Sequence, residues 1–284
     1  MGMKIKQHEV SLNNLKGQKS KLDDSILNLQ VTIGKLYPSR STPNIDDGDS
    51  CPPGDEEEIN QQIMLHEKSA AGILCQLKTH LGKVVGVLQL GSLKDVVGVV
   101  ATLGRVVDDN LSRLLSEYLG LETMMAIVCK SYAGVIALEN YDVQSSIDKS
   151  FGLHGIGASI GKPLDERFLV ICLESLRPYA GNFVLDDPQK KLDLLCPRLP
   201  NGEFPDGFLG FAVNMINIDA SNLSGMTPNG DGLRETLFFN LFSRLQIYKT
   251  RAEMMKAVPF ISHGALSLDG GMMRSSGVFS LGNR

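Results

Sequence analysis

Apolar residues recur at heptad spacing along the first 36 residues of the chain. One heptad position carries Ile5, Leu12, Ile26 and Ile33, and the other carries Leu15, Leu22, Leu29 and Leu36. Isoleucine at the first position and leucine at the second favour a two-stranded coiled coil, in which the interrupting Lys19 and His8 can fix the register. We therefore expect a coiled-coil helix over residues 1–36. The alternative is an amphipathic helix that packs on its own domain.

An acidic segment that contains several prolines follows the heptads. Residues 37–58 carry seven acidic side chains against the single basic residue Arg40, which is typical of a flexible linker. Helical spacing resumes at Ile59 and continues through Ile63, Ile73 and Leu77, after an acid-rich turn that suits a helix N-terminus. We expect a second coil helix over residues 59–83.

From Val84 onwards the pattern changes to short β-branched runs separated by glycine. Helical segments lie between these runs, so we expect an α/β (α+β) domain over residues 84–284. The two halves of this domain repeat the order of strand, helix, strand and helix, which indicates an internal near-duplication. The expected strands are 84–90, 96–100, 125–128, 168–173, 208–218 and 245–248, and the expected helices are 108–119, 132–141 and 233–241.

The composition fits a globular protein, because 43% of the 284 residues are apolar. The formal net charge of −4 gives no overall positive field that would attract nucleic acid or anionic lipid. The five cysteines form no closely spaced pair, so we expect neither a zinc site nor a redox dithiol. This cysteine usage fits a reducing compartment. No run reaches the roughly 18 apolar residues of a membrane helix, and no signal-peptide core is present, so we expect a soluble, intracellular protein.

No motif supplies an obvious catalytic site. Residues 157–163 resemble a phosphate-binding loop, but only three residues separate Gly157 from Gly161, and Pro163 stands where a serine or threonine would bind magnesium. His154 and His263 each lie beside a glycine, which suits a turn or a surface position. The acid pairs at 108–109 and 186–187 are expected to open helices. We expect no enzymatic activity, no cofactor and no metal.

Positive charge gathers at one place late in the chain, at Arg234, Arg244, Lys249 and Arg251. These four residues are the candidates for a weak nucleic-acid contact, and a solvated surface is the alternative. The sequence has no tryptophan and no basic stretch interleaved with aromatic residues. Sequence-specific recognition of nucleic acid is therefore not indicated.

The glycine-bounded strands resemble those of the hinge domain of structural-maintenance-of-chromosomes (SMC) proteins. The segment from Gly98 through Gly104 resembles the opening of that domain, where such a strand precedes a helix, and Gly207-Phe-Leu-Gly210-Phe resembles the second such strand. The resemblance implies a hinge-like domain of two similar subdomains with mixed sheets, preceded by coiled-coil helices. The matching segments are 98–120, 207–219, 249–253 and 266–282.

The resemblance also implies a homodimer that forms through sheet edges, where glycines allow two backbones to approach closely. The Asp-Gly-Gly segment has a second reading as an ordinary tight hairpin. The heptad arm would then hold partner segments. Position matching gives the interface candidates Asp269, Gly270, Gly271, Gly277, Val278, Phe279 and Leu281. The coil candidates for partner binding are Leu15, Leu22, Ile26, Leu29, Ile33 and Leu36.

Within the family, the chain is most similar to a plant member without ATPase heads. That resemblance implies a non-catalytic nuclear scaffold in RNA-directed DNA methylation, which links a Snf2-type chromatin remodeller and a small plant-specific silencing protein to RNA polymerase V recruitment. Two features depart from the family, since the chain ends at Arg284 without a returning helix and Gly282-Asn-Arg replaces a glycine pair. The alternatives are a DNA-binding hinge of a cohesin- or condensin-like complex and a hinge fragment of an ATPase whose head lies elsewhere.

Overall fold

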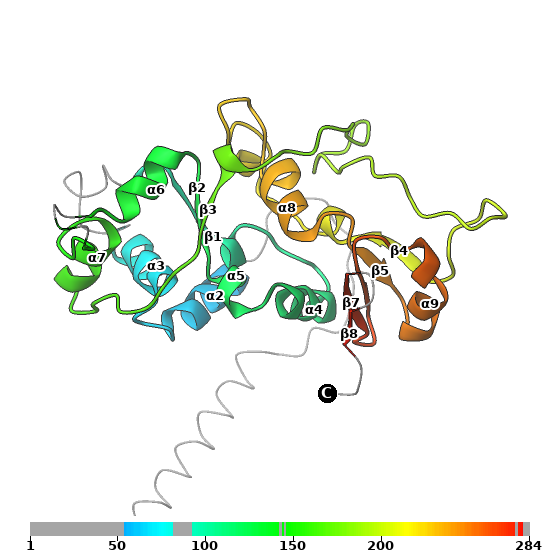
Figure 1. Ribbon diagram of the computed structural model, residues 1–284, viewed down its shortest axis with the longest axis horizontal. Helices are drawn as coiled ribbons and strands as arrows, with labels where there is room; N and C mark the ends of the chain where they lie inside the picture. The colour runs from blue at the N-terminus through cyan, green and yellow to red at the C-terminus, as the bar shows by residue number, and fades with distance from the viewer. Residues whose placement is uncertain (1–53, 82–92, 142–143, 145, 276–277, 281–284) are drawn as a thin grey trace, which may run out of the picture. The chain divides into compact units, whose positions relative to one another are not determined.

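Two β-sheets organise the part of the chain that the structure describes, and each sheet has helices of its own (Figure 1). The structure, a computed structural model, describes residues 54–81, 93–141, 144, 146–275 and 278–280. The expected coiled-coil helix over 1–36, with its six candidate contacts, lies outside the described residues. The linker up to residue 53 and the expected strand over 84–90 also lie outside them.

The first sheet contains three strands, in the order β1 (Val96–Val99), β2 (Ile127–Cys129) and β3 (Val170–Cys172). β1 runs antiparallel to β2, whereas β2 runs parallel to β3. A parallel pair needs a crossover connection, because the chain must return to the same end of the sheet. That crossover contains α6 (Tyr132–Leu138), which packs against both strands, and α7 (Gly152–Ser159).

The second sheet contains five strands, in the order β4 (Phe208–Phe211), β5 (Gln246–Tyr248), β6 (Ala265–Ser267), β7 (Met272–Ser275) and β8 (Val278–Ser280). β4 runs antiparallel to β5, and β5 runs parallel to β6 across a connection that contains α9 (Arg251–Lys256). β6, β7 and β8 continue as an antiparallel meander. The second sheet therefore repeats the first and adds two strands at its end.

The repeat extends to individual positions. Gly98 pairs with Val128 and Gly210 pairs with Ile247, and in both sheets the register shifts just before the glycine. A glycine at a bulge permits the local change of backbone course. A short 3-10 helix follows each strand, as η2 (Val100–Thr102) and η4 (Ala212–Asn214). The expected internal near-duplication and the mixed α/β class are therefore confirmed.

The helix after each middle strand begins in the same way. The Ser131 hydroxyl accepts the N–H of Gly134, and the Thr250 hydroxyl accepts the N–H of Glu253 at 3.3 Å. The Thr250 hydroxyl also donates to the carboxylate of Glu253 at 2.7 Å. These N-caps stop the strand and start the helix that returns the chain to its sheet.

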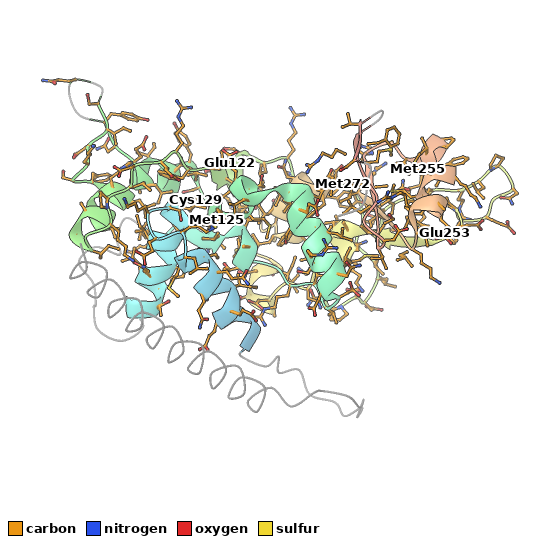
Figure 2. All side chains as sticks on the ribbon, turned by 90° about the horizontal axis from the view of Figure 1, so that it is seen from below. Glu122, Met125, Cys129, Glu253, Met255 and Met272 are labelled. Carbon is orange, nitrogen blue, oxygen red and sulfur yellow. The ribbon has the colours of Figure 1, made fainter. Side chains whose placement is uncertain are left out.

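Each sheet turns one face to a core that the two halves share. The central residues Val128 and Ile247 are fully buried in this shared core. The opposite face of the first sheet buries Cys129 against α3 and α7, and that of the second buries Tyr248 near α9. Figure 2 shows Met125 and Cys129 within the first half and Met255 on α9 within the second. The alternation of faces along each strand thus gives one shared core and two separate ones.

The longer helices of the shared core differ between the halves. α4 (Asp109–Leu119) begins at Asp108, whose carboxylate accepts the N–H of Leu111 at 2.6 Å, as expected for an N-cap. Its counterpart is a π-helical turn, η6 (Arg234–Phe238), that runs into α8 (Phe239–Phe242). The remaining short helices are α5 (Leu121–Met124), η3 (Leu173–Ser175), η5 (Ala220–Asn222) and η7 (Val258–Phe260).

Two helices stand where one coil helix was expected over residues 59–83. They are α2 (Gly54–Met64) and α3 (Ala70–Leu81), and they pack against each other. The hydroxyl of Ser69 accepts the N–H of Gly72 at 3.0 Å and so starts the second helix. Ile63 and Ile73 are buried in the core of the first half. This apolar stripe therefore stabilises the first half of the domain instead of extending as an arm.

The connection between the halves contradicts one capping expectation. Residues 176–207 form no helix or strand, so the acid pair there does not open a helix. Asp186 has a positive φ of 57° within a tight turn, and the carboxylate of Asp187 accepts the N–H of Gln189 at 2.9 Å. An aspartate can cap a turn by the same hydrogen bond that caps a helix, which is why the pair alone was ambiguous.

Candidate interaction surface

β8 forms an edge of the second sheet and carries exposed apolar side chains. Within the described part of the chain it pairs with β7 alone, with Phe279 opposite Met273. Val278 is 53% exposed and Phe279 is 39% exposed. An edge strand presents a row of backbone groups to which another strand can bond. Of the expected interface residues, these two lie on an open edge, whereas Gly277 and Leu281 are outside the described residues.

The other three interface candidates shape a hairpin within their own chain. The Asp269 carboxylate accepts the N–H of Arg251 at 2.8 Å and the hydroxyl of Ser267 at 2.6 Å. Gly270 has a φ of 89°, and a Cβ on Gly271 would lie 2.5 Å from the Ser267 hydroxyl oxygen. Tight turns favour glycine in the left-handed region. Their geometry is thus explained by the turn between β6 and β7 and by the start of α9.

The electrostatics of this turn are those of a capped carboxylate. Burial raises the pKa of Asp269, but the hydrogen bonds from Ser267 and Arg251 outweigh it and hold the pKa below its ordinary value. The carboxylate therefore stays ionised and keeps the hairpin joined to the first turn of α9.

β3 is the corresponding open edge of the first sheet. Among the described residues it pairs with β2 alone, although its counterpart β6 continues into β7 and β8. Its three residues, Val170–Cys172, are all half-buried. In a parallel pair, alternate residues direct their N–H and C=O groups away from the neighbouring strand. Among the described residues, the first sheet thus ends at β3, whereas the second sheet continues past the equivalent strand, β6, into β7 and β8.

A pocket of about 520 Å³ lies beside the start of β3. Val170 lines it from the strand, Phe168 from the segment just before the strand, and Val135 and Leu138 from α6. His154 of α7 is the buried polar residue in its wall, with a relative exposure of 8%. The full lining is Val135, Leu138, Glu139, Ile147, Lys149, His154, Leu164, Asp165, Glu166, Arg167, Phe168 and Val170.

Two polar side chains of the lining, His154 and Glu139, pair with each other, and Tyr141 bonds to Glu139 from outside the lining. His154 Nε2 lies 3.0 Å from Glu139 Oε2, and the Tyr141 hydroxyl donates to Glu139 Oε1 at 2.8 Å. Burial raises the pKa of Glu139, but the hydrogen bonds from His154 and Tyr141 lower it below its ordinary value. The expected turn or surface role of His154 is wrong, because its side chain is buried and paired with Glu139. Its partner lies 15 residues away, so no local pattern could have shown the pair.

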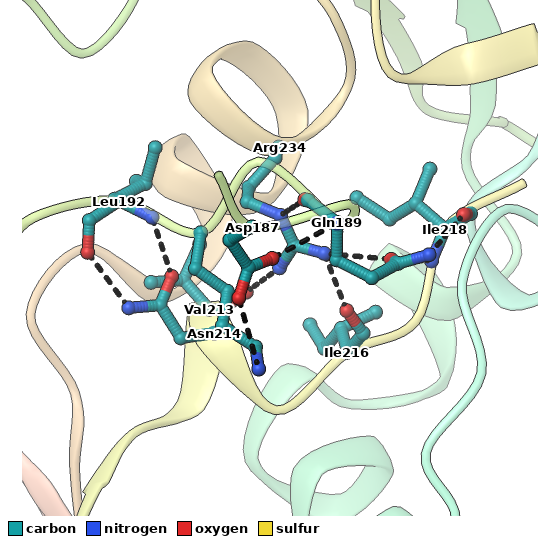
Figure 3. Close-up of polar contacts among 9 residues, drawn as sticks. Asp187, Gln189, Leu192, Val213, Asn214, Ile216, Ile218 and Arg234 are labelled. Carbon is teal, nitrogen blue, oxygen red and sulfur yellow. Dashed lines mark hydrogen bonds and ion pairs between the residues drawn. The ribbon is translucent and has the colours of Figure 1, made fainter. Parts of the chain in front are cut away.

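Arg234 is buried and therefore not available for a nucleic-acid contact, so the expectation is wrong for this one of the four candidate residues. Its side chain is fully buried and donates to the carbonyl oxygens of Ile216 at 2.8 Å, Gln189 at 2.8 Å, and Val213 (Figure 3). Burial lowers the pKa of Arg234 to about 10, against the opposing charges of Asp187 and Glu235. The guanidinium therefore joins the connection between the halves to the second half.

The remaining members of the expected basic cluster lie nearer the surface. Arg244 and Lys249 are exposed, and Arg251 is half-buried. Arg251 also provides the backbone N–H that Asp269 accepts. A phosphate contact by these three residues stays a prediction.

The features that would indicate catalysis do not converge. Residues 157–161 match Gly-x-Ser-x-Gly, a spacing that the sequence prediction overlooked and that in hydrolases places serine at a strand-to-helix turn. Here Ser159 ends α7, and its hydroxyl donates to the carbonyl of Ile156 at 2.7 Å. Among the described residues, no group of three or more His, Cys, Asp and Glu side chains is arranged to hold a metal.

A second pocket, of about 610 Å³, lies between α2, α4 and α5. Its walls include apolar residues such as Ile59, Leu119 and Met124.

None of the helices among the residues described has both the length and the apolarity needed to cross a membrane.

Comparison with known proteins identifies the hinge-like part. No family model matches the chain. The Arabidopsis thaliana "Structural maintenance of chromosomes flexible hinge domain-containing protein GMI1" is 44% identical over 187 residues, which are 66% of this chain and 11% of that protein. The resemblance to the SMC hinge family is thereby confirmed over these residues. The chain spans only about a tenth of the length of this relative.

Solved SMC hinge domains are more distant. The asymmetric dimer of the Geobacillus stearothermophilus hinge is 15% identical, with a TM-score of 0.42, and the match covers 78% of this chain and 69% of that one. The Pyrococcus furiosus hinge is 12% identical, with a TM-score of 0.41, over 82% of this chain and 92% of that one.

Proposed function

We propose that this chain is a non-catalytic scaffold that self-associates when β8 of one copy pairs with β3 of another. A twofold dimer of this kind contains the pairing twice and leaves neither edge open. The proposal rests on one observation, which is the unequal ends of two otherwise equivalent sheets. β6 is followed by β7 and β8, whereas its counterpart β3 has no further strand among the described residues.

The exposed side chains of β8 support this pairing. Val278 and Phe279 are both well exposed on a short edge strand. Full burial of an exposed side chain of this kind contributes about 1.5–3 kcal/mol, and pairing would supply the part of it that corresponds to the surface still exposed. Strand pairing would also satisfy the outward backbone groups of both edges, so apolar burial and hydrogen bonding favour the same contact.

The finer proposal concerns silencing of genes in chromatin. The segments 4–8 and 232–238 resemble those of the plant protein Defective in Meristem Silencing 3, which carries a hinge without ATPase heads. We propose that the chain acts in the nucleus in RNA-directed DNA methylation. There it would link a Snf2-type remodeller and a small plant-specific silencing protein to RNA polymerase V recruitment, with partner segments held along the heptad stripe of residues 1–36.

Light scattering of the full chain tests the self-association. The parent chain is expected to have the mass of a dimer, and the combined change Val278→Asp with Phe279→Asp is expected to give a monomer. Val184→Asp with Leu185→Asp is the matched control, because both side chains are exposed, at 43% and 87%, and lie far from β8 in the sequence. A parent chain that stays monomeric at micromolar concentration, or a double variant that stays dimeric, would contradict the proposed pairing.

A pull-down of the remodeller and the silencing protein tests the role of the heptad stripe. Leu22→Asp with Leu29→Asp should abolish capture of a partner and leave the dimer intact, because both residues occupy the apolar seam. Asn14→Asp with Asn28→Asp adds the same charge outside the seam and should capture normally. Unchanged capture by the leucine variant would reject this role.

A further inference from the structure

We propose that the pocket beside β3 receives the side chain of Phe279 from the second copy and thereby selects the strand that β3 accepts. This inference rests on the proposed pairing of β8 with β3. It adds a specific recognition site, because backbone pairing alone does not distinguish one strand from another.

The position of the pocket relative to the strand is the first argument. Val170 is the first residue of β3, and it lines the pocket together with Phe168, two residues earlier. A strand laid along the open side of β3 therefore runs past Val170, which is part of the pocket lining. Its side chains alternate between the two faces of the sheet, so every second one points to the face on which the pocket lies.

The duplicated topology indicates which side chain that is. Phe279 pairs with Met273, which is buried on the α9 face of the second sheet. Val170 packs on the equivalent face of the first sheet, the face that α6 covers. When one sheet continues into the other with equivalent faces aligned, Phe279 points to the pocket side. Val278 and Ser280 then point to the opposite face.

The chemistry of the pocket suits an aromatic ring. Val135, Leu138, Leu164 and Phe168 give it apolar walls, and its charged lining residues Lys149, Asp165, Glu166 and Arg167 are exposed to solvent. The ring centroids of His154 and Phe168 lie 6.3 Å apart at an interplanar angle of 57°. Glu139 already accepts hydrogen bonds from His154 and Tyr141, so the buried part of the wall offers no unpaired charge to a partner. An apolar ring can enter without leaving a polar group unsatisfied, whereas a charged side chain would lose its hydration.

Photo-crosslinking tests the contact directly in the full chain. Phe279 is replaced by the photoreactive benzoylphenylalanine, and the protein is mixed with a copy labelled with heavy nitrogen, so that links between copies are identified by mass. We expect links from position 279 to residues 135–170 of the other copy. The same replacement at Val278 should not reach these residues. A dimer that crosslinks from position 279 to another region, or from position 278 to the pocket, would overturn the inference and leave the strand pairing standing.

A double-mutant cycle gives a second measurement. Phe279→Ala should weaken the dimer at least about tenfold. Ile147→Ala removes part of an exposed side chain that lines the pocket. In this background, Phe279→Ala should weaken the dimer by a smaller factor. Ile136→Ala is the control, since Ile136 is 51% exposed and lies outside the lining, and its effect should be additive. Additive effects with Ile147 would also overturn the inference, and a parent chain without any dimer would overturn the pairing and the inference together.

Discussion

Arg234 and Gln189 bond to each other twice, although 45 residues separate them in the sequence. The Nε of the arginine donates to the backbone carbonyl of Gln189 at 2.8 Å, and its Nη2 donates to the amide oxygen of the same residue at 3.1 Å. The Gln189 side chain in turn bonds to both backbone groups of Ile218. This network holds the irregular connection between the halves against the second half (Figure 3).

Arg234→Ala is expected to lower the free energy of unfolding by about 3 kcal/mol or more, because several buried carbonyl oxygens would lose their donor. Arg244→Ala changes an exposed arginine and should alter stability by less than about 0.5 kcal/mol. Urea unfolding followed by circular dichroism measures both variants. Equal stability of the two would show that the network contributes little.

The sequence predicted those features that local patterns encode. Glycine-bounded apolar runs gave most of the strands and the duplication, and Asp108 gave the start of α4. It could not show that Arg234 is buried, because the carbonyl groups that bind it come from distant segments. The break between α2 and α3 was missed for a similar reason. An apolar stripe predicts burial, but it does not say whether the partner is another helix or the domain itself.

The hydrogen bonds of the Asp269 carboxylate should make the stability of the folded chain fall at acidic pH. The folded pKa of this carboxyl lies below its unfolded value, since the hydrogen bonds from Ser267 and Arg251 outweigh the effect of burial. Its contribution is therefore fully present above the unfolded pKa of about 3.9 and is lost as the pH falls through the folded value. Asp269→Asn should be less stable at neutral pH and lose less on acidification. The exposed Asp206→Asn is the control, and parallel pH curves for Asp269→Asn and the parent chain would refute the prediction.

Cys129 should resist alkylation in the folded protein. Burial raises the pKa of this thiol to about 12, with smaller contributions from Cys172, its partner in the β2–β3 register, and from Asp95. Because the thiolate is the reactive form, iodoacetamide at pH 8 should leave Cys129 unmodified until urea unfolds the chain. Cys196, which is only half-buried, serves as the internal comparison. Mass spectrometry of the labelled peptides measures both, and rapid labelling of Cys129 under native conditions would show that the first half opens readily.

The helical hairpin of α2 and α3 should be indispensable to the first half of the domain. Ile73 is fully buried, and Ile63 and Leu74 are nearly so, in the same core as the β2 residue Ile127. Losing the burial of each such side chain costs about 1.5–3 kcal/mol, which together rivals the whole stability of a typical domain. Removal of residues 1–83 should therefore abolish the cooperative unfolding of the first half, whereas removal of residues 1–53 should preserve it. Urea unfolding of the two truncated chains tests this prediction. If both chains unfold in the same cooperative transition, the hairpin does not contribute to the core of the first half.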